Sequence, residues 1–176
     1  MSPAPTAVPA GAPVLPDLLG PGLRVLFCGT AAGPESARRR AYYAGPGNRF
    51  WPTLHAAGLT PRRLAPEEYP ALAAWGIGLT DACKTAHGLD HAIPAAAYDP
   101  ARLEAVVALH RPGLVAFTSK RAAGVALGVR DTSRLAYGPQ ERPFAGRPAW
   151  VLPSPSGAAR RHWSPEPWHA LARAVG

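Results

Sequence analysis

Leu23-Arg24-Val25-Leu26-Phe27-Cys28 is a short, largely apolar run that ends at Gly29. A run of this length, bounded by a glycine, is typical of a strand buried on both faces. Similar runs follow at residues 77–80, 114–118 and 149–152. Segments with helical spacing separate them. The pattern predicts an α/β fold, a three-layer α/β/α sandwich with a central, mostly parallel sheet.

The helices are expected over residues 48–57, 66–75, 100–110, 120–127 and 165–175. Gly58 ends the first of them, and Asp99 is expected to cap the third. In parallel sheets the loops beyond the carboxyl ends of the strands carry the functional groups. We therefore expect four loops to converge on one edge of the sheet: residues 29–33, 81–91, 118–120 and 153–161.

The composition bounds the class of protein. The 176 residues suit a single domain, expected over 16–176. Residues 1–15 carry no charge and consist mostly of Pro, Ala and Gly, so we expect a disordered tail. Apolar runs stay short of the ~18–20 residues of a membrane span. Two cysteines, Cys28 and Cys83, exclude a disulfide-dense scaffold and indicate buried free thiols in a cytoplasmic protein, nucleoid-associated if bacterial.

The charge balance favours a polyanionic partner. The chain has 19 Lys and Arg against 11 Asp and Glu, a net charge of +8, and all but Lys84 and Lys120 of the basic residues are arginine. Arginine forks match phosphate oxygens and stack on bases. Clusters occur at residues 38–40, 62–63 and 160–161. A second interpretation, that the arginines reflect only an arginine-rich composition, stays open.

Three segments together carry a family resemblance: VLFCGTAAG (25–33), YAGPGNRFW (43–51) and VLPSPSGAAR (151–160). In order and spacing the chain resembles the mismatch-specific uracil/thymine DNA glycosylases of the uracil-DNA glycosylase superfamily, from about residue 14 to the C-terminus. The resemblance implies an enzyme that flips uracil out of duplex DNA, best from U·G mismatches, and hydrolyses its N-glycosidic bond. It implies a monomer that acts on double-stranded DNA, with no cofactor, no metal and no membrane.

The resemblance also assigns residues to the two parts of the binding site. Tyr43 would stack on the extruded base, although a core aromatic is the alternative, and Asn48 is either a helix cap or a pocket residue. The implied base pocket consists of Gly29, Thr30, Ala31, Tyr43, Asn48 and Ser154. The implied DNA-binding loop, which would enter the gap left by the base, consists of Ser156, Gly157, Ala158, Ala159, Arg160 and Arg161.

The catalytic position departs from the family. Ala31 stands where the family usually has an Asn that positions the hydrolytic water. Residues 79–86 resemble instead the broad-specificity type B uracil glycosylases, in which an Asp at this place is implicated. That residue is Asp81, and a carboxylate suits the cationic transition state of glycosidic cleavage. A turn-capping Asp81 is the alternative, and Asp90 is the second catalytic candidate.

Other candidates carry less weight. His87 and His91 have a metal-like spacing, but Gly88 makes the segment a poor helix and no third ligand is evident. Lys84 could form a Schiff base, although a solvated or phosphate-contacting side chain is favoured. Three further functions stay open: a glycosylase for deaminated purines such as hypoxanthine, a catalytically silent binder of damaged DNA, and a small-molecule α/β enzyme.

Overall fold

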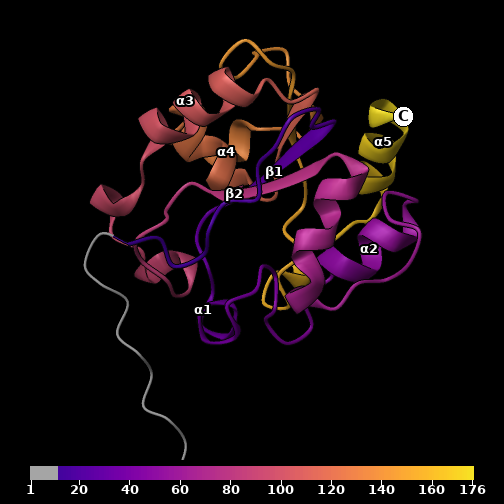
Figure 1. The fold of residues 1–176 in the computed structure, drawn as a ribbon. Coiled ribbons are helices and arrows are strands. Elements are labelled where there is room, and N and C mark those ends of the chain that lie inside the picture. Colours follow the sequence, from indigo (N-terminus) through magenta and orange to yellow (C-terminus); the bar gives the residue numbers. More distant parts are fainter. Residues whose placement is uncertain (1–11) are drawn as a thin grey trace, which may run out of the picture.

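The computed structural model describes residues 12–176 and confirms the α/β/α sandwich (Figure 1). The sheet has the order β2-β1-β3-β5-β4. The pairs β1–β2, β1–β3 and β3–β5 are parallel, whereas β4 runs antiparallel to β5. The strands are β1(Val25–Gly29), β2(Ile77–Asp81), β3(Leu114–Phe117), β4(Gly138–Pro139) and β5(Ala149–Val151). The two-residue β4 is the strand that the sequence did not predict, because it is too short to show a pattern.

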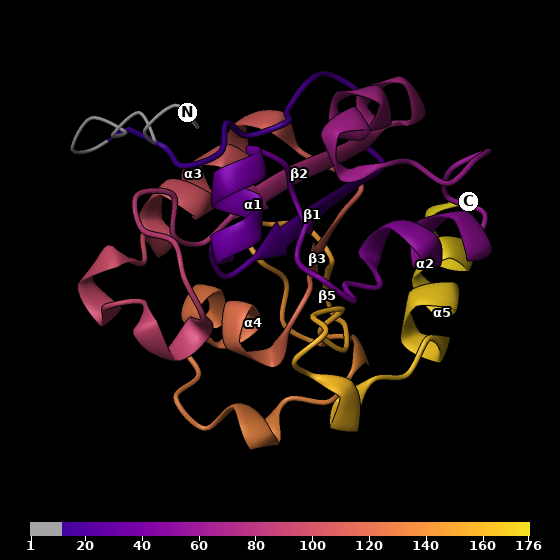
Figure 2. The ribbon, with the colours of Figure 1, turned by 90° about the horizontal axis from the view of Figure 1, so that it is seen from below.

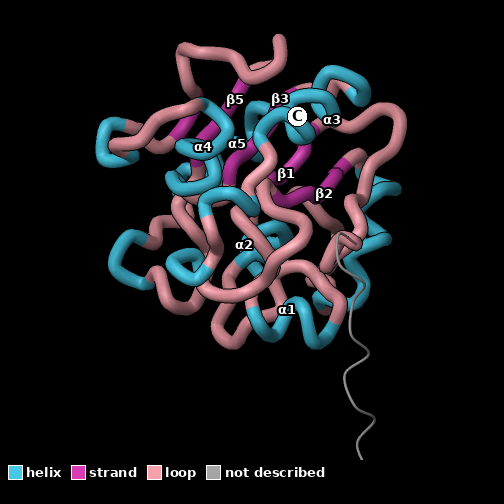
Figure 3. The backbone as a smooth tube through the Cα atoms, turned by 90° about the vertical axis from the view of Figure 1, so that its left-hand side faces the viewer, coloured by secondary structure: helices cyan, strands magenta, loops and turns pink. Residues whose placement is uncertain are grey.

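Helices cover both faces of the sheet. One face carries α2(Phe50–Ala56) and α5(Glu166–Val175), and the other carries α3(Pro100–His110) and α4(Lys120–Leu127) (Figure 2). A further short helix, α1(Pro34–Arg39), follows β1 directly. It was not predicted, because most of its residues are polar and it has no apolar stripe. The loops and α1 gather at one end of the strands (Figure 3).

One predicted helix has a different geometry. Residues Pro66–Trp75 form the 3₁₀ helix η1. Pro70 lies inside it and cannot donate the backbone hydrogen bond that an α-helix needs at that position. The prediction of helical structure is right for this segment, and the prediction of an ordinary α-helix is wrong.

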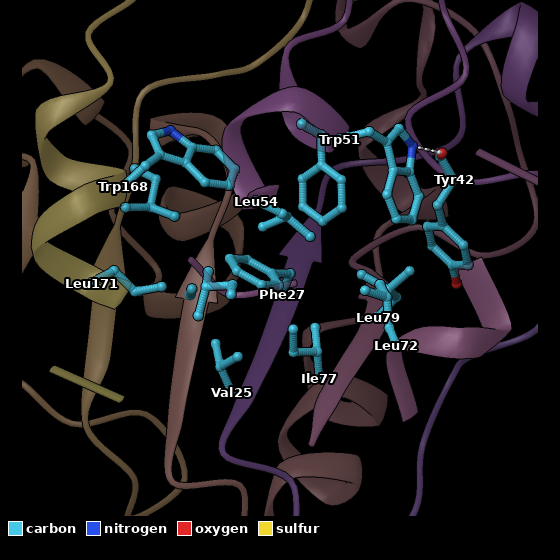
Figure 4. Packing of buried hydrophobic residues seen from close by; sticks show 14 of the residues in the cluster. Val25, Phe27, Tyr42, Trp51, Leu54, Leu72, Ile77, Leu79, Trp168 and Leu171 are labelled. Atoms are coloured by element: carbon cyan, nitrogen blue, oxygen red, sulfur yellow. Dashed lines mark hydrogen bonds between the residues drawn. The ribbon is translucent and has the colours of Figure 1, made fainter. Parts of the chain in front are cut away.

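The core is built on β1, whose side chains alternate between the two faces. Val25 and Phe27 pack on the side of α2 and α5, whereas Leu26 and Cys28 pack on the side of α3 and α4. The Phe27 ring stacks on Trp168 of α5 with centroids 5.7 Å apart (Figure 4). Both faces of β1 are therefore apolar, as the run of residues 23–28 predicted.

The N-terminal segment joins the domain earlier than predicted. Residues 1–11 of the expected tail lie outside the described part of the chain. Leu15, which the prediction placed in the tail, is 1% exposed and belongs to the core. The backbone N–H of Val14 donates to the oxygen of Lys84 at 2.6 Å. An apolar side chain and a backbone donor thus anchor residues 14 and 15, and this part of the tail prediction is wrong.

Within residues 12–176, no helix has both the length and the apolar character that crossing a bilayer requires.

Trp168→Ala tests the core on the α5 side. Trp168 is fully buried and its indole Nε1 donates to Pro153 O at 3.1 Å. We expect the variant to lower the free energy of unfolding by about 3–5 kcal/mol, measured by urea denaturation followed by circular dichroism. Leu109→Ala is the control, since Leu109 is 77% exposed. Equal stabilities of the two variants would contradict this packing.

Candidate active site

A cavity of about 720 Å³ opens where β1, β2 and β3 end. Each of the four loops predicted to converge contributes to its lining, so the prediction of their meeting is confirmed. The segment that includes Tyr42 and Asn48 completes the wall. From the predicted loops the lining includes residues 29–33, Asp81, 88–91, 118–119 and 154–159.

The end of β1 brings three oxygen atoms together. In the sheet register Gly29 pairs with Asp81 of β2. A Cβ on Gly29 would lie 2.7 Å from Asp81 Oδ1, 3.2 Å from the Tyr43 hydroxyl and 3.5 Å from Thr118 Oγ1. The Tyr43 and Thr118 hydroxyls are hydrogen-bonded to each other at 3.1 Å. Position 29 must therefore be glycine for these groups to meet at the floor of the cavity.

Asp81 is a buried carboxylate that faces this cavity. It is 5% exposed, and burial is the main cause that raises its pKa to about 6. Lys84 and Arg102 act in the opposite direction, whereas Asp17 and Asp90 add to the rise. Arg102 donates to the main-chain oxygen of Asp81 at 2.8 Å, which leaves the carboxylate directed to the cavity. A carboxylate of this kind can take a proton from a bound water near neutral pH.

Asp90, the second catalytic candidate, has a different environment. It is exposed, and its Oδ1 accepts a hydrogen bond from Thr30 Oγ1 at 2.7 Å. The backbone N–H of Gly88 also donates to Ala32 O at 2.9 Å. These bonds hold the 87–91 segment over the loop after β1. Thr30 and Asp90 therefore both line the cavity, but Asp90 lies at its rim.

Tyr43 packs against the core and also lines the cavity. Its ring lines the cavity and stacks on Phe50 with centroids 3.9 Å apart. Its backbone has a φ of 53°, a left-handed conformation uncommon for a tyrosine. The pKa of Tyr43 is well above its ordinary value because the group is buried and Asp81 is near, so the hydroxyl stays protonated. A rigid, core-backed aromatic ring thus forms one wall.

Asn48 lies just before Arg49, the N-cap residue of α2, so the helix cap predicted at Asn48 is one residue off. Its Oδ1 accepts from the backbone N–H of Phe50 at 2.9 Å, which satisfies a donor at the start of α2. The same residue lines the cavity, as do Ala31 and Ser154. The hydrogen bond to Phe50 restricts the Asn48 side chain, so its orientation in the cavity is fixed.

The 154–158 loop is tightly folded against the 45–48 loop. Ser154 Oγ accepts from the backbone N–H of Ser156, and Ser156 Oγ accepts from that of Ala158, both at 3.3 Å. A Cβ on Gly157 would collide with Pro46 O. Gly157 is therefore required for the two loops to meet at the cavity mouth.

Arg160 and Arg161 lie beyond the cavity lining, which on this loop ends at Ala159. Both are exposed, in the 3₁₀ helix η5(Arg160–His162), and neither is in an ion pair within residues 12–176. The other two basic clusters are partly neutralised, since Arg39 pairs with Glu67 and Arg62 with Glu68. In the part of the chain that the structure describes, the cluster at 160–161 thus has no member in an ion pair and directly follows the cavity lining.

Some predictions made from the sequence are wrong and some residues were missed. Lys84 is 8% exposed and paired with Asp17, so the solvated or phosphate-contacting side chain expected there is wrong.

Leu89, which is 53% exposed and lines the cavity, was not singled out, because one leucine in a loop gives no pattern. His87 and His91 are exposed, and residues 12–176 contain no cluster of three or more His, Cys, Asp or Glu suited to a metal. Asp99 caps α3, as predicted.

Comparison with known proteins agrees with this geometry. The family model described as the Uracil DNA glycosylase superfamily matches residues 16–173. The chain is also similar to a solution NMR structure from Methanosarcina acetivorans, described as that of a "putative Uracil DNA glycosylase". The two share 26% identity over 92% of this chain and 96% of the other, with a TM-score of 0.65.

Asp81→Asn is expected to stabilise the fold. Because burial raises the pKa of Asp81 from 3.8 to about 6, the folded state binds a proton more tightly than the unfolded state. The wild type therefore loses stability as the pH rises through this range, by on the order of 3 kcal/mol. The asparagine variant escapes this loss, so its advantage should grow from pH 4 to pH 8 in urea unfolding. Asp131→Asn, on the surface, is the control. An advantage that does not grow with pH would contradict the buried carboxylate.

Proposed function

This chain belongs to the uracil DNA glycosylase superfamily, and from that premise we propose that it is a monofunctional glycosylase that releases uracil from duplex DNA, best from U·G mismatches. The observation that carries the proposal is the buried Asp81 carboxylate at the floor of a cavity formed by the carboxyl ends of three strands. The substrate base must leave the duplex to reach this floor, at a cost of roughly a few kcal/mol in lost stacking and pairing.

Asp81 has the chemistry that hydrolysis of an N-glycosidic bond requires. As the bond from the sugar C1′ to the base nitrogen lengthens, positive charge develops on the sugar, and a nearby carboxylate stabilises it. The water oxygen then bonds to C1′ while a proton of the water passes to Asp81. The electrons of the broken bond leave with the base, which takes up a proton afterwards. The products are free uracil and an intact strand with an abasic site.

The cavity walls suit a planar base. Tyr43 offers a ring face that Phe50 holds rigid from behind. Asn48, Thr30 and Ser154 offer amide and hydroxyl groups for the polar edge of the base. Because stacking on Phe50 holds Tyr43 and a hydrogen bond to the Phe50 backbone holds Asn48, the pocket is organised before the base arrives.

The residues after the cavity lining suit the DNA backbone. Ser156 to Ala159 form a small-residue loop at the cavity mouth, where a duplex can approach closely. Arg160 and Arg161 then supply unpaired positive charge next to that mouth. Phosphate contacts of this kind position the duplex without reading its sequence.

A deaminated purine is the second candidate substrate. Ala31 and Ser154 are small, and the cavity of about 720 Å³ leaves room for a base with two rings. Duplexes that contain hypoxanthine or uracil, assayed side by side, separate the two specificities.

Asp81→Asn should lower the rate of uracil release from a U·G duplex at least about a hundredfold, since the asparagine side chain cannot accept the proton of the water. Free uracil and abasic strand are scored separately, and duplex binding is measured in parallel. Asp131→Asn should match the wild type. Asp90→Asn tests the rival carboxylate: loss of activity there, with activity retained in Asp81→Asn, would overturn the assignment.

If wild type and variants bind the duplex but release neither uracil nor hypoxanthine, the protein is a silent binder of damaged DNA and the proposed enzyme activity is wrong.

Arg160→Ala and Arg161→Ala should each weaken binding to duplex DNA regardless of its sequence. Each phosphate contact removed lowers the slope of log affinity against log salt concentration by about one. Fluorescence anisotropy at several salt concentrations measures that slope. Arg130→Ala is the control, because Arg130 is exposed and outside the cavity lining. Equal slopes for the three variants would exclude this loop from the DNA contact.

A further inference from the structure

A second carboxylate, that of the partly buried Asp17, lies outside the cavity lining and holds two cations. Its Oδ1 is 2.8 Å from Lys84 Nζ, and its Oδ2 is 2.8 Å from an Arg102 guanidinium nitrogen. Thr80 Oγ1 also donates to Asp17 Oδ1 at 2.8 Å. Neither Asp17, Lys84 nor Arg102 lines the cavity. The cluster is thus a separate charged layer behind the end of β2.

This layer is in direct contact with the residue proposed to be catalytic. Thr80 immediately precedes Asp81, and Lys84 follows three residues later. Arg102 donates to Thr80 Oγ1 at 3.0 Å and to the main-chain oxygen of Asp81 at 2.8 Å. Asp17 and Asp81 therefore share the same two neighbouring cations, but only Asp17 takes them in ion pairs.

Asp17 is held firmly on its own side of the strand. The next residue, Leu18, exchanges two backbone hydrogen bonds with Leu79 of β2, at 2.9 and 3.0 Å. The previous residue, Pro16, accepts from the Tyr42 hydroxyl at 2.9 Å, and Lys84 Nζ donates to that same hydroxyl at 3.0 Å. Lys84 thus has two anchored oxygen partners, the Asp17 carboxylate and the Tyr42 hydroxyl.

Without such partners the buried Lys84 ammonium would form an ion pair with the nearest carboxylate, because an unpaired buried charge is costly. The other carboxylate near Lys84 is that of Asp81. Among the charged groups around Asp81, Lys84 has the largest electrostatic effect on its pKa. In an ion pair with Lys84, Asp81 would turn from the cavity and become a poorer proton acceptor.

We propose that Asp17 is a positioning residue that keeps Lys84 and Arg102 in its own ion pairs, so that the Asp81 carboxylate stays unpaired and open to the cavity. This inference rests on the proposed function of Asp81. It accounts for a buried lysine close to a carboxylate with which it forms no ion pair.

The charged and titratable groups that face Asp81 come from every neighbouring segment. Lys84 comes from the strand's own continuation, Asp17 from the N-terminal segment, Arg102 from α3 and Asp90 from the rim, and Tyr42, Tyr43 and Cys28 complete the set. Loss of the Asp17 charge removes one anion and leaves both cations near Asp81. Both changes favour the ionised form of Asp81, so its pKa should fall.

The test is Asp17→Asn, which keeps the shape and removes the charge. In uracil release as a function of pH, the acidic limb of kcat should move down by about one pH unit or more. We also expect kcat at pH 8 to fall at least about tenfold while KM stays within about threefold, as for a group that acts on the chemical step. Glu166→Gln is the control, because Glu166 also pairs with an arginine but lies on α5, outside the cavity lining.

Asp17→Asn leaves Lys84 buried and without its partner, which endangers folding. A second comparison, in the Lys84→Met background, avoids this difficulty because ammonium and carboxylate are removed together. Since part of the effect of Asp17 acts through Lys84, Asp17→Asn should shift the acidic limb less in the Lys84→Met background than in the wild type, the non-additivity expected of a coupled pair. An equal shift in both backgrounds would overturn the proposal, and so would an unchanged limb in folded Asp17→Asn.

A direct titration separates this inference from the proposed function. The carboxyl ¹³C resonance of Asp81, assigned by its loss in Asp81→Asn, should titrate at lower pH in Asp17→Asn than in the wild type. This readout needs no catalysis. If the wild type releases no uracil, the proposed function fails while the control of Asp81 by Asp17 is still measured. An unchanged titration overturns the inference even if the enzyme is active.

Discussion

The register between β1 and β2 is the constraint on which the site depends. It places Gly29 opposite Asp81, and the missing side chain of Gly29 lets the Asp81 carboxylate, the Tyr43 hydroxyl and Thr118 meet. A slip of one residue would direct Asp81 to the other face of the sheet. The side-chain pattern of β2 opposes that slip, because it would take Ile77 and Leu79 out of the core beside α2 and α5 and put Gly78 and Thr80 in their place.

This arrangement places two carboxylates away from water, Asp17 behind the end of β2 and Asp81 at the cavity, and each meets that cost in a different way. Asp17 is satisfied by Lys84, Arg102 and Thr80, and its pKa is lowered despite its burial because the contacts to Lys84 and Thr80 outweigh it. Asp81 lacks such pairing, and its pKa is raised. The paired Asp17 carboxylate therefore stabilises the end of β2, whereas the unpaired Asp81 carboxylate destabilises it. A fold with more stability would pair both, and it would then leave the cavity without a free carboxylate.

The sequence predicted the parts of the site that follow local rules. Four of the five strands, the convergence of four loops and the position of Asp81 at the end of β2 all follow from apolar runs and their boundaries. The 3₁₀ geometry of η1 was missed, because Pro70 lies inside a segment with helical spacing. The helix α1 was missed, because it is short and mostly polar. The burial of Lys84 was missed for another reason. Its partner, Asp17, lies 67 residues away in the sequence, at the start of the predicted domain.

By itself the sequence determined the alternation of strands and helices, the glycines at positions 29 and 157, and the residue types at the carboxyl edge of the sheet. Apolar periodicity and backbone sterics act over a few residues, so they can be recognised without a structure. Tertiary structure alone decided which of the charged groups are paired. Lys84 pairs with Asp17 rather than with Asp81, three residues away, because the N-terminal segment pairs with β2 and brings the Asp17 carboxylate within 2.8 Å of the ammonium. An ion pair between residues so far apart in the sequence depends on their distance in space, which the sequence alone does not predict.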